Sequence, residues 1–252
     1  MSNVTQKTSG GSTACYILEL QKVCKSFGLV QANKNIDLQI QPGTIHGIIG
    51  ENGAGKSTLM NILYGLHRAD SGSMFIDGAP TRIKSSADAL SLGIGMVHQH
   101  FMLIPRFTVL ENVMLGSEGG ALLKLGRAST IAKLKELGQT FDMEVDPDLL
   151  VSDLNVGMRQ RVEILKALKG GAKILILDEP TGVLTPQEAT QLFDILNKLR
   201  VNGVTILLIT HKLAEIMAIT DNVSIMRGGE MVGHRKTSET NPQELAELMV
   251  GR

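Results

Sequence analysis

This sequence has few aromatic side chains and no excess of positive or negative charge. Aromatic residues make up 3% of its 252 residues, and none is tryptophan. Proteins that bind single-stranded nucleic acid stack the bases on aromatic side chains, so this scarcity argues against such a platform. Lysine and arginine total 25, and aspartate and glutamate also total 25, so the formal net charge is zero. Because a protein that neutralises many phosphates needs a basic excess, we expect no nucleic-acid partner.

Cysteines and long apolar runs are also scarce. The two cysteines, Cys15 and Cys24, cannot form a disulfide framework, and no histidine stands at zinc-ligand spacing from them, which favours free thiols in a reducing compartment. No apolar run approaches the roughly 18 residues of a membrane-spanning helix. Residues 1–14 are polar and lack the apolar segment of a secretory signal. We therefore expect a disordered tail followed by a soluble, cytosolic domain.

Glycine and apolar residues are plentiful, with 27 glycines and a hydrophobic fraction of 43%. Short apolar runs alternate with helical patterns, which predicts an α/β domain whose core sheet is mostly parallel. Residues 105–168 have almost no strand pattern, which indicates an α-helical subdomain. The predicted helices begin at Gly55, Thr108, Ala121 and Gly157 or span Pro186–Val201 and Asn241–Val250. The predicted strands are Tyr16–Val23, Asn35–Ile40, Thr44–Ile49, Lys173–Leu177, Val204–Thr210, Val223–Met226 and Glu230–His234.

The sequence GENGAGKS at residues 50–57 matches the phosphate-binding loop pattern, and Thr58 follows it. Glycines allow successive backbone N–H groups to turn inward around an anion, beside the positive end of the next helix. Lys56 can reach the β- and γ-phosphates of a nucleotide, and the Ser57 hydroxyl can coordinate Mg²⁺. The simpler alternative is a glycine-rich turn without a ligand. An apolar strand before the loop and a helix after it provide the context that phosphate binding requires.

The sequence ILILDE at residues 174–179 is an apolar strand that ends in two acids. A carboxylate at the carboxyl end of a parallel strand lies at the edge of the sheet where ligands bind. We expect Asp178 to hold Mg²⁺, directly or through water, and Glu179 to accept a proton from the water that attacks the γ-phosphate. The simpler alternative is that the two acids cap the following loop.

The order of these motifs resembles the nucleotide-binding domain of the ABC transporters, over nearly the whole length from Tyr16 to Arg252. The loop GENGAGKST fits that family better than other phosphate-loop proteins. Taken alone, the remaining matching residues would be read as ordinary polar or core residues, but their order and spacing agree with the family. They are Gln99 in VHQH (the glutamine loop), LNVGMRQ at 154–160 (the signature sequence), His211 (the switch histidine) and Phe27 in KSFG (the aromatic ring against adenine).

The resemblance implies a P-loop NTPase domain of the ABC type over residues 15–252. Its expected parts are a mostly parallel core sheet, an antiparallel β subdomain and an inserted α-helical subdomain at about 105–168. The implied cofactors are ATP and Mg²⁺. The implied catalytic residues are Lys56, Gln99, Glu179 and His211, and the implied metal ligands are Ser57, Gln99 and Asp178. The implied ATP-binding residues are Phe27, Gly50, Asn52, Gly53, Ala54, Gly55, Lys56, Ser57, Thr58, Gln99, Asn155, Val156 and Gly157.

The resemblance also implies partners. Two nucleotide-binding domains of the family pair head to tail, so the signature of one closes over ATP held by the phosphate loop of the other. The resemblance implies that this chain is an ATP-hydrolysing subunit that energises a membrane importer. It would bind integral-membrane permease subunits at the cytoplasmic face of the inner membrane, as a peripheral subunit, and would act indirectly with a substrate-binding protein.

Two departures from the common family pattern indicate a subfamily. Asn155 stands where serine is common in the signature, and Thr185 stands where many members have an acidic residue. The segments VGMRQRVEILKAL and DEPTGVLTPQE resemble importers of sugars and nucleosides, whose ATPase is a tandem of two such domains. The segment GIGMVHQHFMLIPRFTVLENVMLG is more similar to the nucleoside (purine) branch. The chain would then correspond to the first half of the tandem.

Three other functions are alternatives to this one. ABC-type ATPases of DNA repair insert coiled-coil arms between the phosphate loop and the signature, and this chain has no heptad array there. A ribosome-associated ATPase would be expected to have a second domain and basic linkers. A dimerising regulatory module with weak or no hydrolysis stays open because of Asn155. Methionines at 96, 102 and 114 indicate either an adaptable partner surface or ordinary core filling.

Overall fold

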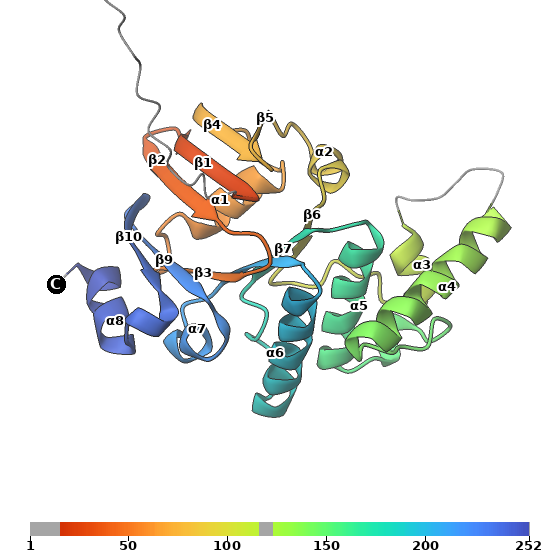
Figure 1. Cartoon of the computed structure of the whole chain (residues 1–252). Coiled ribbons are helices and arrows are strands. Elements are labelled where there is room, and N and C mark those ends of the chain that lie inside the picture. The colour runs from red at the N-terminus through yellow and green to blue at the C-terminus, as the bar shows by residue number, and fades with distance from the viewer. Residues whose placement is uncertain (1–15, 116–122, 252) are drawn as a thin grey trace, which may run out of the picture.

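The computed structural model describes residues 16–115 and 123–251. Four parts of the sequence lie outside the described residues: the predicted tail, Cys15, the predicted helix start at Ala121, and Arg252. Two sheets and the helices between and below them make up the described part of the chain (Figure 1). No helix in this part is both long and apolar enough to cross a membrane.

The smaller sheet is antiparallel and has the strand order β2-β1-β4-β5. Its first hairpin is longer than the predicted strands because both strands continue past the buried residues toward the turn at Gly28. The sequence pattern does not predict the other two strands, since only one of their side chains is fully buried. The bounds are β1 Leu18–Phe27, β2 Val30–Ile40, β4 Ser71–Ile76 and β5 Ala79–Thr81. The predicted antiparallel β subdomain is thus present.

The larger sheet has the order β10-β9-β3-β8-β7-β6. Every neighbouring pair is parallel except the edge pair of β10 with β9, so the predicted mostly parallel core sheet is confirmed. Strand β6 is absent from the sequence-based prediction because it is four residues long and contains Gly95. The bounds are β3 Ile45–Ile49, β6 Ile94–Val97, β7 Ile174–Asp178, β8 Thr205–Ile209, β9 Asn222–Arg227 and β10 Glu230–Lys236.

Local sequence accounts for most helix starts. Thr108 and Thr185 cap their helices with capping boxes, and Asn155 and Asn241 cap theirs through side-chain oxygens. The short helices α2 and α7 escape prediction because six or seven residues show too little periodicity. The bounds are α1 Lys56–Leu63, α2 Ser86–Ser91, α3 Val109–Met114, α4 Leu123–Phe141, α5 Val156–Lys169, α6 Pro186–Val201, α7 Leu213–Ile219 and α8 Pro242–Val250, with 3-10 turns η2 Val151–Asp153 and η3 Thr237–Glu239.

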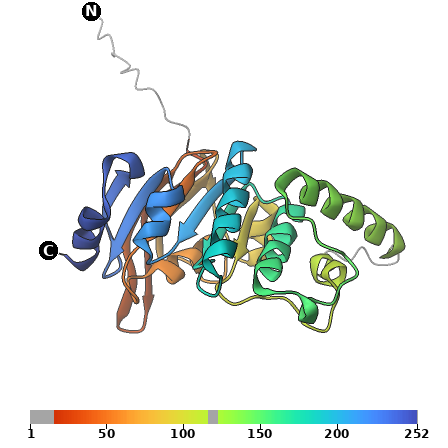
Figure 2. The same ribbon diagram turned by 90° about the horizontal axis from the view of Figure 1, so that it is seen from below.

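Helix α1 packs between the two sheets, whereas α5, α6 and α7 cover the opposite face of the core sheet (Figures 1 and 2). Side chains alternate along the buried strands, so each core strand contributes to both layers. In β7, Leu175 and Leu177 belong to the hydrophobic cluster on the side of α5 and α6. Ile174 and Ile176 belong to the cluster on the side of α1. The core sheet is therefore buried on both faces, as a parallel sheet requires.

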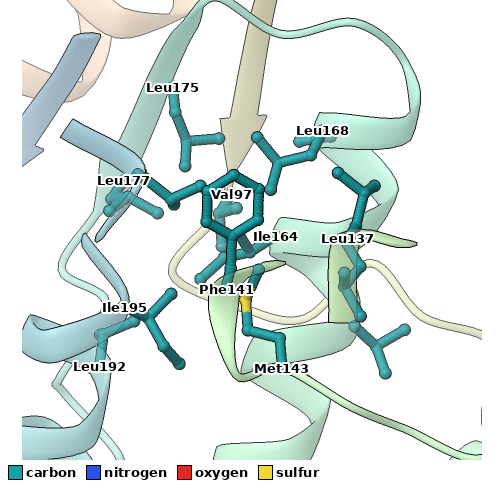
Figure 3. Close-up of a cluster of buried hydrophobic side chains, with 14 of the residues drawn as sticks. Val97, Leu137, Phe141, Met143, Ile164, Leu168, Leu175, Leu177, Leu192 and Ile195 are labelled. Atoms are coloured by element: carbon teal, nitrogen blue, oxygen red, sulfur yellow. The ribbon is translucent and has the colours of Figure 1, made fainter. Parts of the chain in front are cut away.

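Helices α3, α4 and α5 lie at one end of the core sheet, within the range predicted to be helical (Figure 1). The cluster in Figure 3 joins them to the sheet: Phe141 of α4 packs among side chains of α5, α6, β6 and β7. One hydrophobic cluster thus runs from the helical segment into the core. The limits of a separate helical subdomain at 105–168 stay a prediction.

Candidate functional site

The loop between β3 and α1 has a backbone that only glycine accommodates at two positions. Gly55, which precedes the first turn of α1, has a φ of 100°, and a Cβ there would lie 2.3 Å from the Ala32 carbonyl oxygen. A Cβ on Gly50 would lie 2.4 Å from the Met226 carbonyl oxygen. The loop is therefore wedged between β2 and the end of β9. Its N–H groups and the start of α1 together make an anion-binding concavity.

Lys56 is the cation of this loop. Its side chain curls back, and Nζ donates to the carbonyl oxygens of Gly50 at 2.7 Å and Glu51 at 3.0 Å. The residue is 7% exposed, and this burial lowers the pKa of its ammonium group, against the opposing charges of Glu179 and Asp178. A phosphate bound in the loop would accept hydrogen bonds from the Lys56 ammonium group. Its negative charge would also offset the cost of burying that ammonium.

Contacts from strand β2 and from the β9–β10 turn hold the loop, and the sequence patterns do not indicate them. Asn33 of β2 donates from Nδ2 to the Gly55 carbonyl at 3.1 Å. Gly229, in the turn between β9 and β10, donates its N–H to the Ala54 carbonyl at 3.1 Å and accepts from the Lys34 N–H at 2.7 Å. The alternation of Ile36, Leu38 and Ile40 places position 33 on the outward face, so the sequence carries no signal for this contact.

The two predicted acids lie at the end of β7, beside β8, with Asp178 in register with Ile209. The pKa of Asp178 is raised, mainly by burial and also by the charge of Glu179, whereas Lys56 lowers it. Glu179 has a φ of 46°, a left-handed conformation that is uncommon for a residue other than glycine. A residue held in such a conformation needs support from its surroundings.

Glu179 contacts two of the other predicted catalytic residues. Its Oε1 lies 2.9 Å from Nδ1 of His211, which directly follows Thr210 at the end of β8, and its Oε2 accepts from Nε2 of Gln99 at 3.4 Å. In this arrangement the imidazole N–H donates to the carboxylate. Three residues that are far apart in the sequence are thus brought to one point, at the carboxyl ends of adjacent parallel strands.

A cavity of about 700 Å³ opens over this point. It contains most of the predicted site: Asn52, Gly53, Ala54, Gly55, Lys56, Ser57, Thr58, Gln99, Asp178, Glu179 and His211. Gly50 contributes through its carbonyl bond to Lys56 rather than to the cavity wall. The sequence patterns missed five further lining residues, which belong to β2 and to the β9–β10 turn: Val30, Gln31, Ala32, Gly228 and Gly229.

The predicted magnesium ligands suit a hard cation shared with phosphate. Ser57, Gln99 and Asp178 line the same cavity and offer a hydroxyl, an amide oxygen and a carboxylate. Mg²⁺ prefers oxygen ligands and is usually held by one or two carboxylates, waters and phosphate oxygens. Among the described residues there is no cluster of three or more His, Cys, Asp or Glu side chains that could hold a metal without such help.

Besides Gly50, four predicted residues lie away from the cavity wall. Phe27 is 45% exposed, and its ring makes an edge contact with His67 at a centroid distance of 5.1 Å. Asn155, Val156 and Gly157 begin helix α5, where the Asn155 side chain accepts the Met158 N–H at 2.8 Å. The Gly157 N–H donates to Oε1 of Glu188 at 3.3 Å. Their predicted contacts with ATP therefore stay predictions.

The chain is similar to known proteins in both sequence and structure. The family profile described as ABC transporter matches residues 33–182. The nucleoside import ATP-binding protein NupA of Lactococcus lactis subsp. cremoris is 48% identical over 94% of this chain and 47% of its own length. The glucose import ATP-binding protein TsgD13 of Haloferax volcanii is 46% identical over 93% of this chain and 48% of its own length. The chain thus spans about half the length of these curated relatives.

Solved structures agree with these matches. An ATP-binding cassette of an ABC transporter in its ADP conformation superposes with a TM-score of 0.82 at 25% identity, covering 94% of this chain and 99% of that one. A dimeric bacterial ABC transporter cassette superposes with a TM-score of 0.72 at 28% identity, covering 87% and 98%. The predicted fold class is therefore confirmed, and the chain belongs to the ABC transporter family.

Proposed function

We propose that the chain binds ATP with Mg²⁺ and hydrolyses it to energise a membrane importer of nucleosides or sugars. The observation that carries the proposal is the convergence of the phosphate loop, Asp178, Glu179, Gln99 and His211 on one cavity. The relatives' names support the transport role, since they include nucleoside, guanosine and glucose import ATP-binding proteins.

The geometry suggests a role for each side chain. The phosphate loop and Lys56 hold the β- and γ-phosphates, and Ser57, Gln99 and Asp178 hold Mg²⁺, which would screen the developing phosphate charge. Glu179 orients the attacking water and takes its proton. His211 donates to Glu179, which fixes the direction of the carboxylate.

A second nucleotide-binding domain is the proposed partner for the signature residues. Asn155 is exposed and Gly157 is half-buried, and neither lines this chain's own cavity. In a head-to-tail pair they would face ATP held by the other domain. Asn155 uses its side-chain oxygen for the helix cap, which leaves its amide group as a donor in place of the usual serine hydroxyl. Phe27 is proposed to pack against adenine.

Permease subunits are the proposed membrane partner, with a substrate-binding protein acting through them. A groove of about 290 Å³ lies between the glutamine loop and helices α3 and α5. Met102 at this groove is 60% exposed and would be available to a partner, whereas Met96 is buried and fills the core. The groove suits a permease helix that presents both apolar and charged side chains at the cytoplasmic face of the membrane, since Glu163, Lys166 and Lys169 also line it. Its apolar lining includes Tyr64, Leu90, Met96, Met102, Val113 and Leu115.

The hydrolytic role is tested by single-turnover kinetics of Glu179→Gln. Glutamine keeps the shape of the side chain but cannot take a proton from water, so we expect ATP binding to persist while hydrolysis falls at least about a hundredfold. The variant should also accumulate ATP-bound dimers, measured by size exclusion with light scattering. Equal hydrolysis by the variant and the wild-type chain would remove Glu179 from its proposed role.

The transport role is tested separately, with the full-length ATPase and its permease in proteoliposomes and the substrate-binding protein on the outside. Labelled nucleosides and sugars are offered outside, with ATP supplied on the side of the ATPase. We expect uptake of one of these classes that requires ATP and fails with Glu179→Gln. ATP hydrolysis without uptake of either class would contradict the importer assignment and favour a regulatory or other non-transport ATPase.

A further inference from the structure

Behind the proposed catalytic residues lies a polar cluster that does not line the ATP cavity. It consists of Thr181, Thr210, Lys212 and Glu215. Thr181 lies two residues after Glu179, and Thr210 immediately precedes His211. Glu215 belongs to the first turn of α7, and its side chain is only 11% exposed. The cluster therefore joins three elements that meet at the carboxyl ends of β7 and β8.

The carboxylate of Glu215 connects the two loops, one with each oxygen. The Thr181 hydroxyl donates to Oε1, and the Thr210 hydroxyl donates to Oε2 at 3.1 Å. Both threonines are almost completely buried. A buried hydroxyl without a partner is costly, so these bonds strongly favour one separation of the two loops.

Lys212 completes the cluster from the other side. Its Nζ donates to the Thr181 hydroxyl at 3.1 Å and pairs with Oε1 of Glu215 at 3.2 Å. Its backbone N–H donates to the Thr210 hydroxyl at 3.1 Å. Each threonine hydroxyl thus donates to Glu215 and accepts from Lys212, so both hydroxyls have a donor and an acceptor in place.

The loops held in this way carry the two side chains that hydrogen-bond over the cavity. Glu179 needs support because its backbone is left-handed, and one part of that support is the bond from its N–H to the Ile209 carbonyl at 2.8 Å. The bond from Glu215 to Thr181 secures the same loop two residues further on. Without it, the loop after β7 would keep fewer bonds to the loop after β8 and would move more freely relative to His211.

We propose that Glu215 is a positioning residue that sets the placement of Glu179 relative to His211 by joining the loops after β7 and β8. It touches neither the cavity nor a reacting atom. The proposal rests on the proposed ATP hydrolysis for its kinetic consequence. Its structural consequence, a change in the mobility of the two loops, is measurable without ATP.

The kinetic test compares Glu215→Ala with the wild-type chain. We expect kcat to fall about ten- to a hundredfold, as when groups that orient catalytic ligands are removed, while KM for ATP changes by less than about twofold. Such a split is expected because the bonds that hold the phosphate loop do not involve Glu215. Glu215→Gln keeps one accepting oxygen and should recover part of the lost kcat.

Glu244→Ala is the matched control. Glu244 also lies in the first turn of a helix, where it accepts a threonine hydroxyl at 2.7 Å and an arginine N–H at 2.7 Å, but it lies in α8 away from the cavity. It should leave kcat unchanged. If Glu215→Ala also leaves kcat unchanged, or changes kcat and KM in parallel with the melting temperature, the proposal is wrong.

Hydrogen exchange of the ATP-free chain separates this proposal from the proposed function. We expect Glu215→Ala to speed exchange in peptides covering 179–183 and 210–212 at least about fivefold, with exchange across 50–57 unchanged. Unchanged exchange in the first two regions would overturn the proposal even in an active enzyme. Absence of ATP hydrolysis by the wild-type chain would instead count against the proposed function.

Discussion

A buried histidine that does not line the proposed ATP cavity should make this chain sensitive to acid. His46 is 4% exposed, and its Nε2 lies 2.7 Å from the Ser224 hydroxyl, which in turn lies 2.8 Å from Nδ1 of His234. Burial, reinforced by the charge of His234, lowers the pKa of His46 to about 3. The folded chain therefore holds this ring neutral at pH values where the unfolded chain protonates it.

This difference predicts acid destabilisation. Below pH 6.5, the ordinary pKa of histidine, the unfolded state binds a proton that the folded state rejects. The free energy of unfolding should then fall by about 1.4 kcal/mol per pH unit from this group, levelling off near the folded pKa. Urea denaturation at pH 7, 6 and 5 measures the slope. His46→Gln should flatten it, whereas His100→Gln, at an exposed position, should not. Equal slopes for all three proteins would refute the assignment.

At the scale of elements, the start of α6 explains how Thr185 can replace the acidic residue common in the family. Its hydroxyl accepts the Glu188 N–H at 3.3 Å, and Oε2 of Glu188 accepts the Thr185 N–H at 2.9 Å. This reciprocal pair is a capping box. A threonine in a capping box stabilises the helix start about as much as an aspartate that caps the helix alone. The departure seen in the sequence therefore preserves the helix start.

Substitution of this cap gives a direct prediction. Thr185→Ala should lower the free energy of unfolding by about 1 kcal/mol, and Thr185→Asp should change it by only a few tenths. Thr190→Ala is the control, since Thr190 lies inside the same helix and its hydroxyl only returns to the Pro186 carbonyl. That variant should be neutral or slightly stabilising. Chemical denaturation measures all three, and a larger loss for Thr190→Ala than for Thr185→Ala would contradict the capping argument.

At the scale of the whole molecule, the cluster around Phe141 joins the helical segment to the core sheet, so we expect the two to unfold together (Figure 3). Phe141→Ala should therefore lower the free energy of unfolding by about 3–5 kcal/mol in a single transition. Phe107→Ala, at a partly exposed ring, is the matched control and should cost much less. Calorimetry and denaturation followed by two probes measure the outcome. Two separate transitions in the wild-type chain would instead favour an independent helical subdomain.

The motifs of the proposed site and several helices could be predicted from the sequence because each depends on a short run of neighbouring residues. The phosphate loop depends on a short run of glycines with Lys56 and Ser57, and the acidic strand end depends on six consecutive residues, so both are visible without a structure. Long helices with clear caps, such as α6 and α8, were predicted close to their observed bounds for the same reason. The short strands β4, β5 and β6 were missed because too few of their residues carry a pattern.

Tertiary structure decided what lies next to these motifs. Asn33, Gly229 and Glu215 contact the site from distant segments, and no spacing in the sequence links them to it. Hydrogen bonds between loops depend on the order of strands in the sheet, which places β7 beside β8 and β3 beside β9. The sequence by itself therefore determined the family and the chemical groups of the site. The fold determined which backbone carbonyls, hydroxyls and carboxylates hold those groups in place, because such contacts form only after the strands have paired.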